Sequence, residues 1–456
     1  MKIQLPATRA LMSCMPLMLM LAACGGGGSS GSDDSGSDGA MPAVSDVFAN
    51  PEAAGADVGW TLADSSQVTG YLVTAAAAGH PTVSKTVPGS ANAATLSGLV
   101  ADQDYTITVN AQYSAGSTPS TTATVHVPRL INTLAETTAF QSAATYSASH
   151  TGDAVLIMRD GQIVFERYNG DFSRDDIHVL ASGTKSFSCG FMLAAETGGY
   201  VTRDQKASDV ITEWKSDPNK SQATVRQLLS LQSGLSTNPD YSPANVGQLD
   251  TYQLAIDDPA NYAPGDAFIY DPLAFQAFAL MFERKSGNTD PIEFIRSKVF
   301  TPIGLSGDVW QRDAQNHPQM AGGASLSAPM WARYGQLMLQ NGTWQSARVL
   351  PAEGVKDCLT YANPAYLGYG ISWWLNRNVG DTYDPSVDMI PADGVAGPSG
   401  QIAPNAPADL AMAAGTGHQR LYLLPTQRLV VVRLAPLSTE TDEWSDDEFL
   451  SRLLGS

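Results

Sequence analysis

Residues 177–197 read IHVLASGTKSFSCGFMLAAET and carry the most informative pattern in the chain. A strand-like run, Ile177 to Leu180, leads into Ser182-Gly183-Thr184-Lys185, and an apolar run typical of a buried helix follows. The pattern predicts Ser182 at a helix N-terminus, where backbone N–H groups can stabilise an oxyanion. Lys185 would lie one turn further on, close enough to take the seryl proton. An N-cap serine followed by a surface lysine fits the same four residues.

The sequence on either side of this motif predicts one antiparallel sheet covered by helices. Two strand-like runs flank Asp160-Gly161, which is a strong hairpin signal, and strand-like runs return near the end of the sequence. The expected strands are 154–158, 163–167, 421–424 and 429–434. The expected helices lie within 130–149 and around 183–197, 222–232, 271–286, 290–299 and 328–341.

Other sequence motifs of serine hydrolases do not indicate an α/β-hydrolase active site. The single G-x-S-x-G match, at 27–31, lies in a Gly/Ser tract, so the nucleophile elbow of the α/β-hydrolases is absent. Tyr361-Ala362-Asn363 spells a Tyr-x-Asn, but no helix start follows it. Tyr270, directly before an apolar helix, is the better candidate for a catalytic tyrosine, and a core tyrosine bonded to backbone is the alternative.

Several segments in consistent order resemble the class C β-lactamase-like serine hydrolases over about 130–456. The family includes class C β-lactamases, D,D-peptidases, esterases and 6-aminohexanoate-oligomer hydrolases, and the resemblance implies their α/β (α+β) fold. The matching segments are Thr224–Leu235, Pro264-Gly265 with Tyr270, Gly322-Gly323 with Leu326-Ser327, Tyr334–Leu337, and Gly368-Tyr369-Gly370.

The resemblance implies a role for each site residue. Ser182 is the acylated nucleophile, and Lys185 and Tyr270 form the base pair that moves its proton to the leaving group. The third family motif falls within Ala413–Gln419. There the N–H of Thr416 is the second oxyanion donor beside Ser182. The remaining expected substrate-binding positions are Gly415, Gly417 and His418, of which His418 also fits a structural role.

Three departures from the family pattern bear on the substrate. Pro272 stands where the family has an Asn, Ala413 where it has a Lys, and Gln232 where it has a His. The first two losses argue against β-lactamase and D,D-carboxypeptidase activity and fit esterases and amide hydrolases. Trp373 and Trp374 either line an aromatic acyl pocket or fill the core.

The sequence therefore predicts a hydrolase that cleaves a small ester or amide through a seryl acyl-enzyme, similar to the esterases or 6-aminohexanoate-oligomer hydrolases. A catalytically silent scaffold of the same fold and a cell-wall D,D-peptidase are the alternatives. No cofactor is expected. The six His are scattered without a Cys/His cluster, so no metal site is expected. Cys189 and Cys358 are predicted to be buried small hydrophobic residues, with a disulfide between them as the alternative.

Residues 42–128 predict a separate β-sandwich, which makes the chain multidomain. Short alternating runs at 58–62, 70–73 and 105–109 are typical of strands, with Trp60 as core anchor. Leu99 and Tyr105 have the spacing of a tyrosine corner. The segment resembles a fibronectin type III domain, leaving 129–456 for the hydrolase domain.

The first residues predict export and a lipid anchor. A basic start and a short apolar run over 1–23 are typical of a signal peptide. Leu21-Ala22-Ala23-Cys24 resembles a bacterial lipobox, so Cys24 is the expected lipidation site, and 24–41 form a Gly/Ser/Asp spacer. These features predict a lipoprotein tethered to a membrane, by resemblance the outer membrane, facing the periplasm or the surface. The net charge of −19 argues against nucleic acid as a partner.

Overall fold

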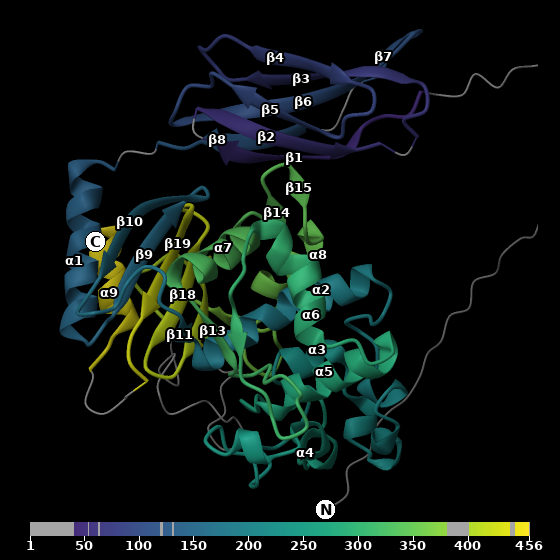
Figure 1. Ribbon diagram of the computed structural model, residues 1–456, viewed down its shortest axis with the longest axis vertical. Coiled ribbons are helices and arrows are strands. Elements are labelled where there is room, and N and C mark those ends of the chain that lie inside the picture. Colours follow the sequence, from purple (N-terminus) through teal and green to yellow (C-terminus); the bar gives the residue numbers. More distant parts are fainter. Residues whose placement is uncertain are drawn as a thin grey trace, which may run out of the picture. The chain divides into compact units, whose positions relative to one another are not determined.

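The computed structural model describes residues 41–52, 54–62, 64–118, 122–129, 132–380, 401–437 and 443–455 (Figure 1). The predicted signal peptide, Cys24 and nearly all of the spacer lie outside these residues. Among the described helices, none is both long and apolar enough to cross a membrane.

Two antiparallel sheets form the N-terminal β-sandwich, with strand orders β1-β2-β5 and β4-β3-β6-β7, and β8 also pairs with β6. Trp60 is buried in their shared core, with its ring 5.0 Å from that of Tyr71. The Val100 N–H donates to Tyr105 Oη over 3.0 Å, which makes the predicted tyrosine corner. The strands are β1 Ser45–Glu52, β2 Gly55–Thr61, β3 Val68–Ala76, β4 Val83–Pro88, β5 Ala93–Ser97, β6 Gln103–Tyr113, β7 Gly116–Thr118 and β8 Thr122–Val127.

One six-stranded antiparallel sheet organises the second domain, in the order β10-β9-β19-β18-β17-β16. Helices α1 (Leu134–Ser149) and α9 (Asp446–Leu454) pack together on one side of it, and α7 (Ala328–Leu339) covers β9, β18 and β19 from the other (Figure 1). Asp160 and Gly161 both have positive φ, as a tight hairpin requires. The strands are β9 Ala154–Arg159, β10 Gln162–Tyr168, β16 Trp374–Leu375, β17 Ala411–Gly415, β18 Gln419–Leu424 and β19 Leu429–Leu434.

A helical layer and a small three-stranded sheet, β11-β13-β12, complete this domain. The helix expected around 183–197 begins as a 3-10 turn, and only five residues of the one expected at 222–232 are α-helical. The elements are β11 His178–Val179, η1 Ala181–Ser186, α2 Phe187–Thr197, α3 Val225–Leu229, α4 Thr251–Asp257, α5 Leu273–Ser286, α6 Pro291–Ile295, π-helical η6 Arg296–Phe300, β12 Val309–Trp310, β13 Ala324–Leu326, β14 Thr343–Trp344, β15 Ala347–Arg348 and α8 Ala352–Thr360.

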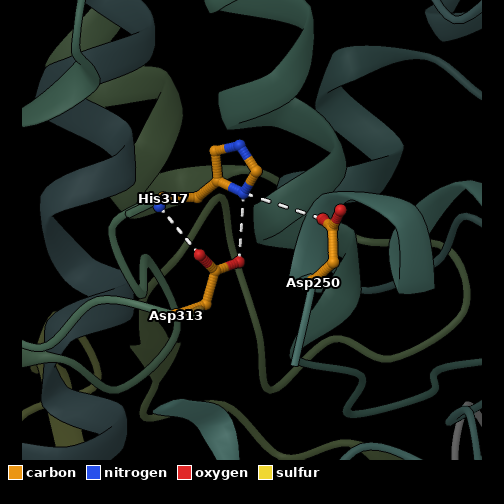
Figure 2. A group of neighbouring side chains, drawn as sticks. All are labelled: Asp250, Asp313 and His317. Atoms are coloured by element: carbon orange, nitrogen blue, oxygen red, sulfur yellow. Dashed lines mark hydrogen bonds and ion pairs between the residues drawn. The ribbon is translucent and has the colours of Figure 1, made fainter. Parts of the chain in front are cut away.

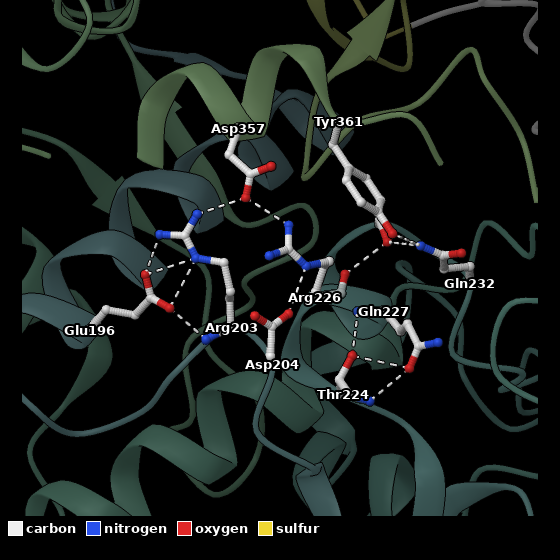
Figure 3. Close-up of polar contacts among 10 residues, drawn as sticks. Glu196, Arg203, Asp204, Thr224, Arg226, Gln227, Gln232, Asp357 and Tyr361 are labelled. Carbon is white, nitrogen blue, oxygen red and sulfur yellow. Dashed lines mark hydrogen bonds and ion pairs between the residues drawn. The ribbon is translucent and has the colours of Figure 1, made fainter. Parts of the chain in front are cut away.

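Helix α8 is fastened to the helical layer in two ways. Cys358 forms a disulfide with Cys189 of α2, so the expectation of two unpaired buried cysteines is wrong and the bridged alternative holds. Figure 3 shows Asp357 between the guanidinium groups of Arg203 and Arg226, at 2.7 and 2.6 Å. Burial opposes ionisation of Asp357, but its bonds to Arg226 and Arg203 outweigh burial and lower its pKa.

Candidate active site

Ser182 lies on a sharp turn between β11 and the helical layer. Ala181 has a φ of 47°, in the left-handed region, and this reverses the chain after the buried Leu180. Thr184 Oγ1 holds the turn in place, because it donates to Ala181 O over 2.7 Å and accepts from the Ala324 N–H of β13 over 3.0 Å. Ser182 is thus the second residue of a helical stretch that continues into α2, though its first turn is 3-10 rather than α.

Lys185 points back at Ser182. Its Nζ lies 3.1 Å from Ser182 Oγ and 2.9 Å from the carbonyl oxygen of Ala321. The lysine is 3% exposed, so a surface lysine behind an N-cap serine does not describe this motif. The same Nζ lies 4.6 Å from the centre of the Tyr270 ring. The fold therefore gathers the three predicted catalytic residues, although they come from two distant segments.

The Tyr270 ring is held by other aromatic side chains. It stacks on Trp374 with ring centres 5.6 Å apart, and the Tyr369 ring packs edge to face with its centre 6.5 Å away. Trp373 and Trp374 are both buried in the main core. Of the two hypotheses for this pair, the structure supports core packing, with Trp374 as the support of Tyr270.

Ser182 and Lys185 open onto a cavity of about 370 Å³. Among the lining residues that the structure describes, Lys185 is the single charged one. Tyr241, Pro243 and Val246 provide apolar surface there. The lining residues within the described part of the chain are Val179, Ala181, Ser182, Lys185, Tyr241, Pro243, Val246, Pro272, Gln311, Gln319, Ala321, Gly322, Thr416 and Leu437.

The predicted third motif lies at the end of β17 and in the turn to β18. A Cβ at Gly415 would overlap the carbonyl oxygen of Leu180 and come within 3.0 Å of the Gly183 nitrogen, so only glycine lets β17 approach η1 this closely. Thr416 follows directly and lines the cavity. Gly417, with a φ of 77°, turns the chain against Pro436.

His418 lies outside the cavity lining. Its Nδ1 is 3.4 Å from Arg420 Nη2, and its ring stacks on Trp444 at 6.2 Å. Arg420 is itself buried and ion-paired to Asp446 over 2.8 Å. Burial opposes ionisation of Asp446, but Arg420 outweighs burial and holds its pKa below the ordinary value. These contacts fit the structural role that the sequence left open for His418. The charge of Arg420 is paired with that of Asp446.

The three departures take different places in the structure. Pro272 lines the cavity where the family has an amide side chain. Ala413 is buried within β17. Gln232 is buried away from the cavity and donates to Ser230 Oγ over 2.8 Å and to Tyr361 Oη over 3.0 Å, as Figure 3 shows for the tyrosine.

A pair of carboxyl groups that no sequence pattern predicted includes that of Asp271, next to Tyr270 in the chain. Asp271 is fully buried and accepts hydrogen bonds from the N–H groups of Leu273 and Ala274, both over 3.1 Å, at the start of α5. Asp258 is also fully buried and lies against Asp271, and both of its oxygens lack a donor. Burial and the neighbouring Asp271 charge raise the pKa of Asp258, and burial raises that of Asp271. We therefore expect the pair to share one proton at neutral pH, and the pH dependence of stability tests this expectation.

A second cluster, Asp250, Asp313 and His317, has the spacing of metal ligands (Figure 2). The Asp313 carboxylate already accepts from Thr251 Oγ1 over 2.7 Å and from His317 Nδ1 over 3.0 Å. Burial opposes its ionisation, but these bonds lower the pKa of Asp313 to about 2. Thr251 Oγ1 also accepts from Gln319 Nε2 over 3.1 Å. Because Gln319 lines the cavity, the cluster works as a structural ion pair that supports one cavity wall.

Comparison with known protein families shows the class of protein to which this chain belongs. Residues 135–455 match the beta-lactamase family model, and residues 42–127 match the fibronectin type III domain model. Because the first match covers more than half of the chain, the protein belongs to the beta-lactamase family, preceded by a fibronectin type III domain.

Particular relatives are hydrolases. The 6-aminohexanoate-dimer hydrolase of Paenarthrobacter ureafaciens is 27% identical over 225 residues, which are 45% of this chain and 57% of that protein. The chain thus matches less than two thirds of that relative's length. A family VIII carboxylesterase has a TM-score of 0.55 at 16% identity, covering 71% of this chain and 97% of its own. EstCE1, a hydrolase with promiscuous acyltransferase activity, has a TM-score of 0.54 at 14% identity, covering 70% and 98%. These two likenesses concern the fold.

Proposed function

We propose that the protein is a serine hydrolase that cleaves an ester or amide bond through an acyl-enzyme on Ser182. The observation that carries the proposal is the buried Lys185 Nζ, 3.1 Å from Ser182 Oγ, with Tyr270 packed against it. A buried amine beside a serine at the wall of a cavity is the arrangement that nucleophilic catalysis needs. The hydrolases among the relatives support the same reaction type.

In the proposed mechanism, Ser182 Oγ attacks the substrate carbonyl carbon while the Lys185/Tyr270 pair takes its proton. The N–H groups of Ser182 and Thr416 stabilise the oxyanion that forms. The pair then delivers the proton to the leaving oxygen or nitrogen, and the C–O or C–N bond breaks to leave the acyl-enzyme. Water then attacks the carbonyl carbon of the acyl-enzyme while the Lys185/Tyr270 pair takes its proton. The pair returns the proton to Ser182 Oγ as the acyl C–O bond breaks, and the acid is released.

The substrate proposed for this cavity is neutral. In the described part of the lining, the one charged residue is Lys185, and its Nζ is already held by Ser182 and Ala321. Arg420, the nearest alternative cation along the third motif, is ion-paired with Asp446. An anionic substrate would lack a counter-ion here, whereas a neutral ester or amide needs none.

Replacing the nucleophile tests this proposal. Ser182→Ala should reduce hydrolysis of p-nitrophenyl butyrate to the background rate, because no oxygen remains to be acylated. The matched control is Ser188→Ala, a buried serine on the adjoining α2 whose Oγ has no hydrogen-bond partner. Unchanged turnover in purified Ser182→Ala would refute the assignment.

The lipid anchor at Cys24 and the outer-membrane location are also part of our proposal, and they rest on the sequence pattern alone. Metabolic labelling with a palmitate analogue should modify the wild-type chain and not Cys24→Ala. Equal labelling of both would exclude the anchor.

A further inference from the structure

The three-stranded sheet β11-β13-β12 has one covered face and one open face. Trp310, Ala324 and Leu326 are buried on the covered face. On the open face, Val179 and Val309 both pair with Ser325 of the central strand, so the three side chains lie in one row across the sheet. Val179 is 40% exposed and Val309 is 56% exposed. A valine row in contact with water is an apolar surface without a partner in the described part of the chain.

This open face continues into the active-site cavity. Val179 lies three residues before Ser182 and lines the cavity, and Gln311, two residues after Val309 and on the same side of the chain, lines it too. Leu437, 47% exposed, is a further apolar lining residue, and Ile177, 40% exposed, lies two residues before Val179. The side chains named on this face carry no charge.

The size of the cavity indicates why such a surface is useful. A volume of about 370 Å³ is at the lower end for small-molecule sites. An acyl chain that does not fit into this volume beside the leaving group extends out of the cavity. Val179 is the lining residue that joins the cavity to the open face of the sheet, so that face is the apolar path such a chain can follow.

We infer that this face, made by Ile177, Val179, Val309 and Ser325, binds the aliphatic acyl chain of the substrate, and that the enzyme prefers neutral medium-chain acyl esters or amides. The inference rests on the proposed function and specifies its substrate class. The acyl group stays bonded to Ser182 until water attacks, so apolar contacts beside Ser182 hold it through both halves of the reaction. The same contacts stabilise both transition states and raise kcat/KM.

A chain-length series of p-nitrophenyl esters tests this inference. Burying one methylene group is worth about fourfold in binding, so partial burial of four extra groups should give octanoate about a tenfold higher kcat/KM than butyrate. Val309→Asp should lower the ratio of octanoate to butyrate kcat/KM to about 1, because a carboxylate replaces the apolar contact with the longer acyl chain. The matched control is Val100→Asp, a 45% exposed valine in the β-sandwich, which should keep the wild-type ratio.

The outcomes distinguish failure of the acyl-chain site from failure of the proposed serine hydrolase function. If butyrate is turned over and octanoate is not preferred, the acyl-chain site is wrong and the hydrolase proposal stands. The same holds if Val309→Asp keeps the preference for octanoate. No Ser182-dependent turnover of any ester in the series would overturn both. Val309→Ser is a milder variant for the same comparison if the aspartate variant does not fold, with the circular dichroism spectrum as the check.

Discussion

The Tyr270 hydroxyl can be removed with little change in packing. Phenylalanine keeps the ring that stacks on Trp374 and the face that meets Lys185 Nζ. Tyr270→Phe should therefore fold normally and lower kcat for p-nitrophenyl butyrate by about 10²–10⁴-fold, because proton transfer by a positioned side chain contributes a factor of that order.

The control for Tyr270→Phe is Tyr361→Phe. Tyr361 begins the literal Tyr-x-Asn of the sequence, but its hydroxyl accepts from Gln232 outside the cavity. This variant should keep kcat within about twofold. Loss of activity in Tyr361→Phe but not in Tyr270→Phe would exchange the roles of the two tyrosines.

Asp258 gives a pH prediction of definite sign. Its folded pKa is raised from 3.8, so it contributes stability that is complete below pH 3.8 and is lost as the pH rises. Above that pH, folding must take up one proton for the Asp258/Asp271 pair. That proton alone lowers the wild-type free energy of unfolding by about 1.4 kcal/mol per pH unit.

Asp258→Asn should remove this dependence, because an amide donates to Asp271 without taking up a proton. Urea unfolding of both proteins at pH 5, 6.5 and 8 measures the difference. The free energy of unfolding of the variant should increase relative to that of the wild type as the pH rises. Parallel pH profiles would show that the pair holds no proton in the folded state.

At the residue scale, sequence reasoning selected Ser182, Lys185 and Tyr270, and the structure gathers them. Asp258 was not predicted from the sequence, because an isolated aspartate has no sequence signature and only the fold brings it to Asp271. The pairing of Arg420 with Asp446 has no local signal in the sequence either, because Asp446 comes from a distant helix.

The approach of β17 to η1 is the element-scale feature that places Thr416 beside Ser182. Gly415→Ala would put a methyl group against the backbone of Leu180 and Gly183, and backbone cannot step aside as a flexible side chain does. We expect β17 to shift and kcat/KM for p-nitrophenyl butyrate to fall by about 10²-fold or more, as when one oxyanion donor is lost.

The matched control is Gly247→Ala. A Cβ at Gly247 meets nothing within 4 Å. This variant should keep wild-type activity, and both variants are compared by the same ester assay. Full activity in Gly415→Ala would mean that this strand edge takes no part in catalysis.

Whole elements were predictable where periodicity was strong. The 154–168 hairpin and the strands at 421–424 and 429–434 form as predicted, because alternation and turn residues are local signals. The 3-10 start of the 183–197 helix could not be predicted in this way. The turn is fixed by the hydrogen bond between Thr184 and Ala324, which lies far away in sequence. Of the small sheet β11-β13-β12, the sequence predicted β11, within the strand-like run 177–180. Strands β12 and β13 were missed, because strands of two and three residues have no periodicity.

At the scale of the whole molecule, charge determines which substrates are favoured. The chain has a net charge of −19, and the one cation among the described lining residues, Lys185, is bonded to Ser182 and Ala321. The value of kcat/KM for p-nitrophenyl butyrate should therefore exceed that for the anionic nitrocefin by about a hundredfold or more, the scale of one missing buried charge pair. Comparable values for both substrates on one preparation would show that a cation reaches the site after all.

The central claim is that Ser182 is the acylated nucleophile. Intact-mass and peptide mass spectrometry after treatment with a fluorophosphonate probe tests it most directly. A single adduct on the peptide that contains Ser182, lost in Ser182→Ala and retained in Ser188→Ala, is the predicted result. An adduct on a different residue, or ester turnover by protein that takes up no probe, would contradict the account.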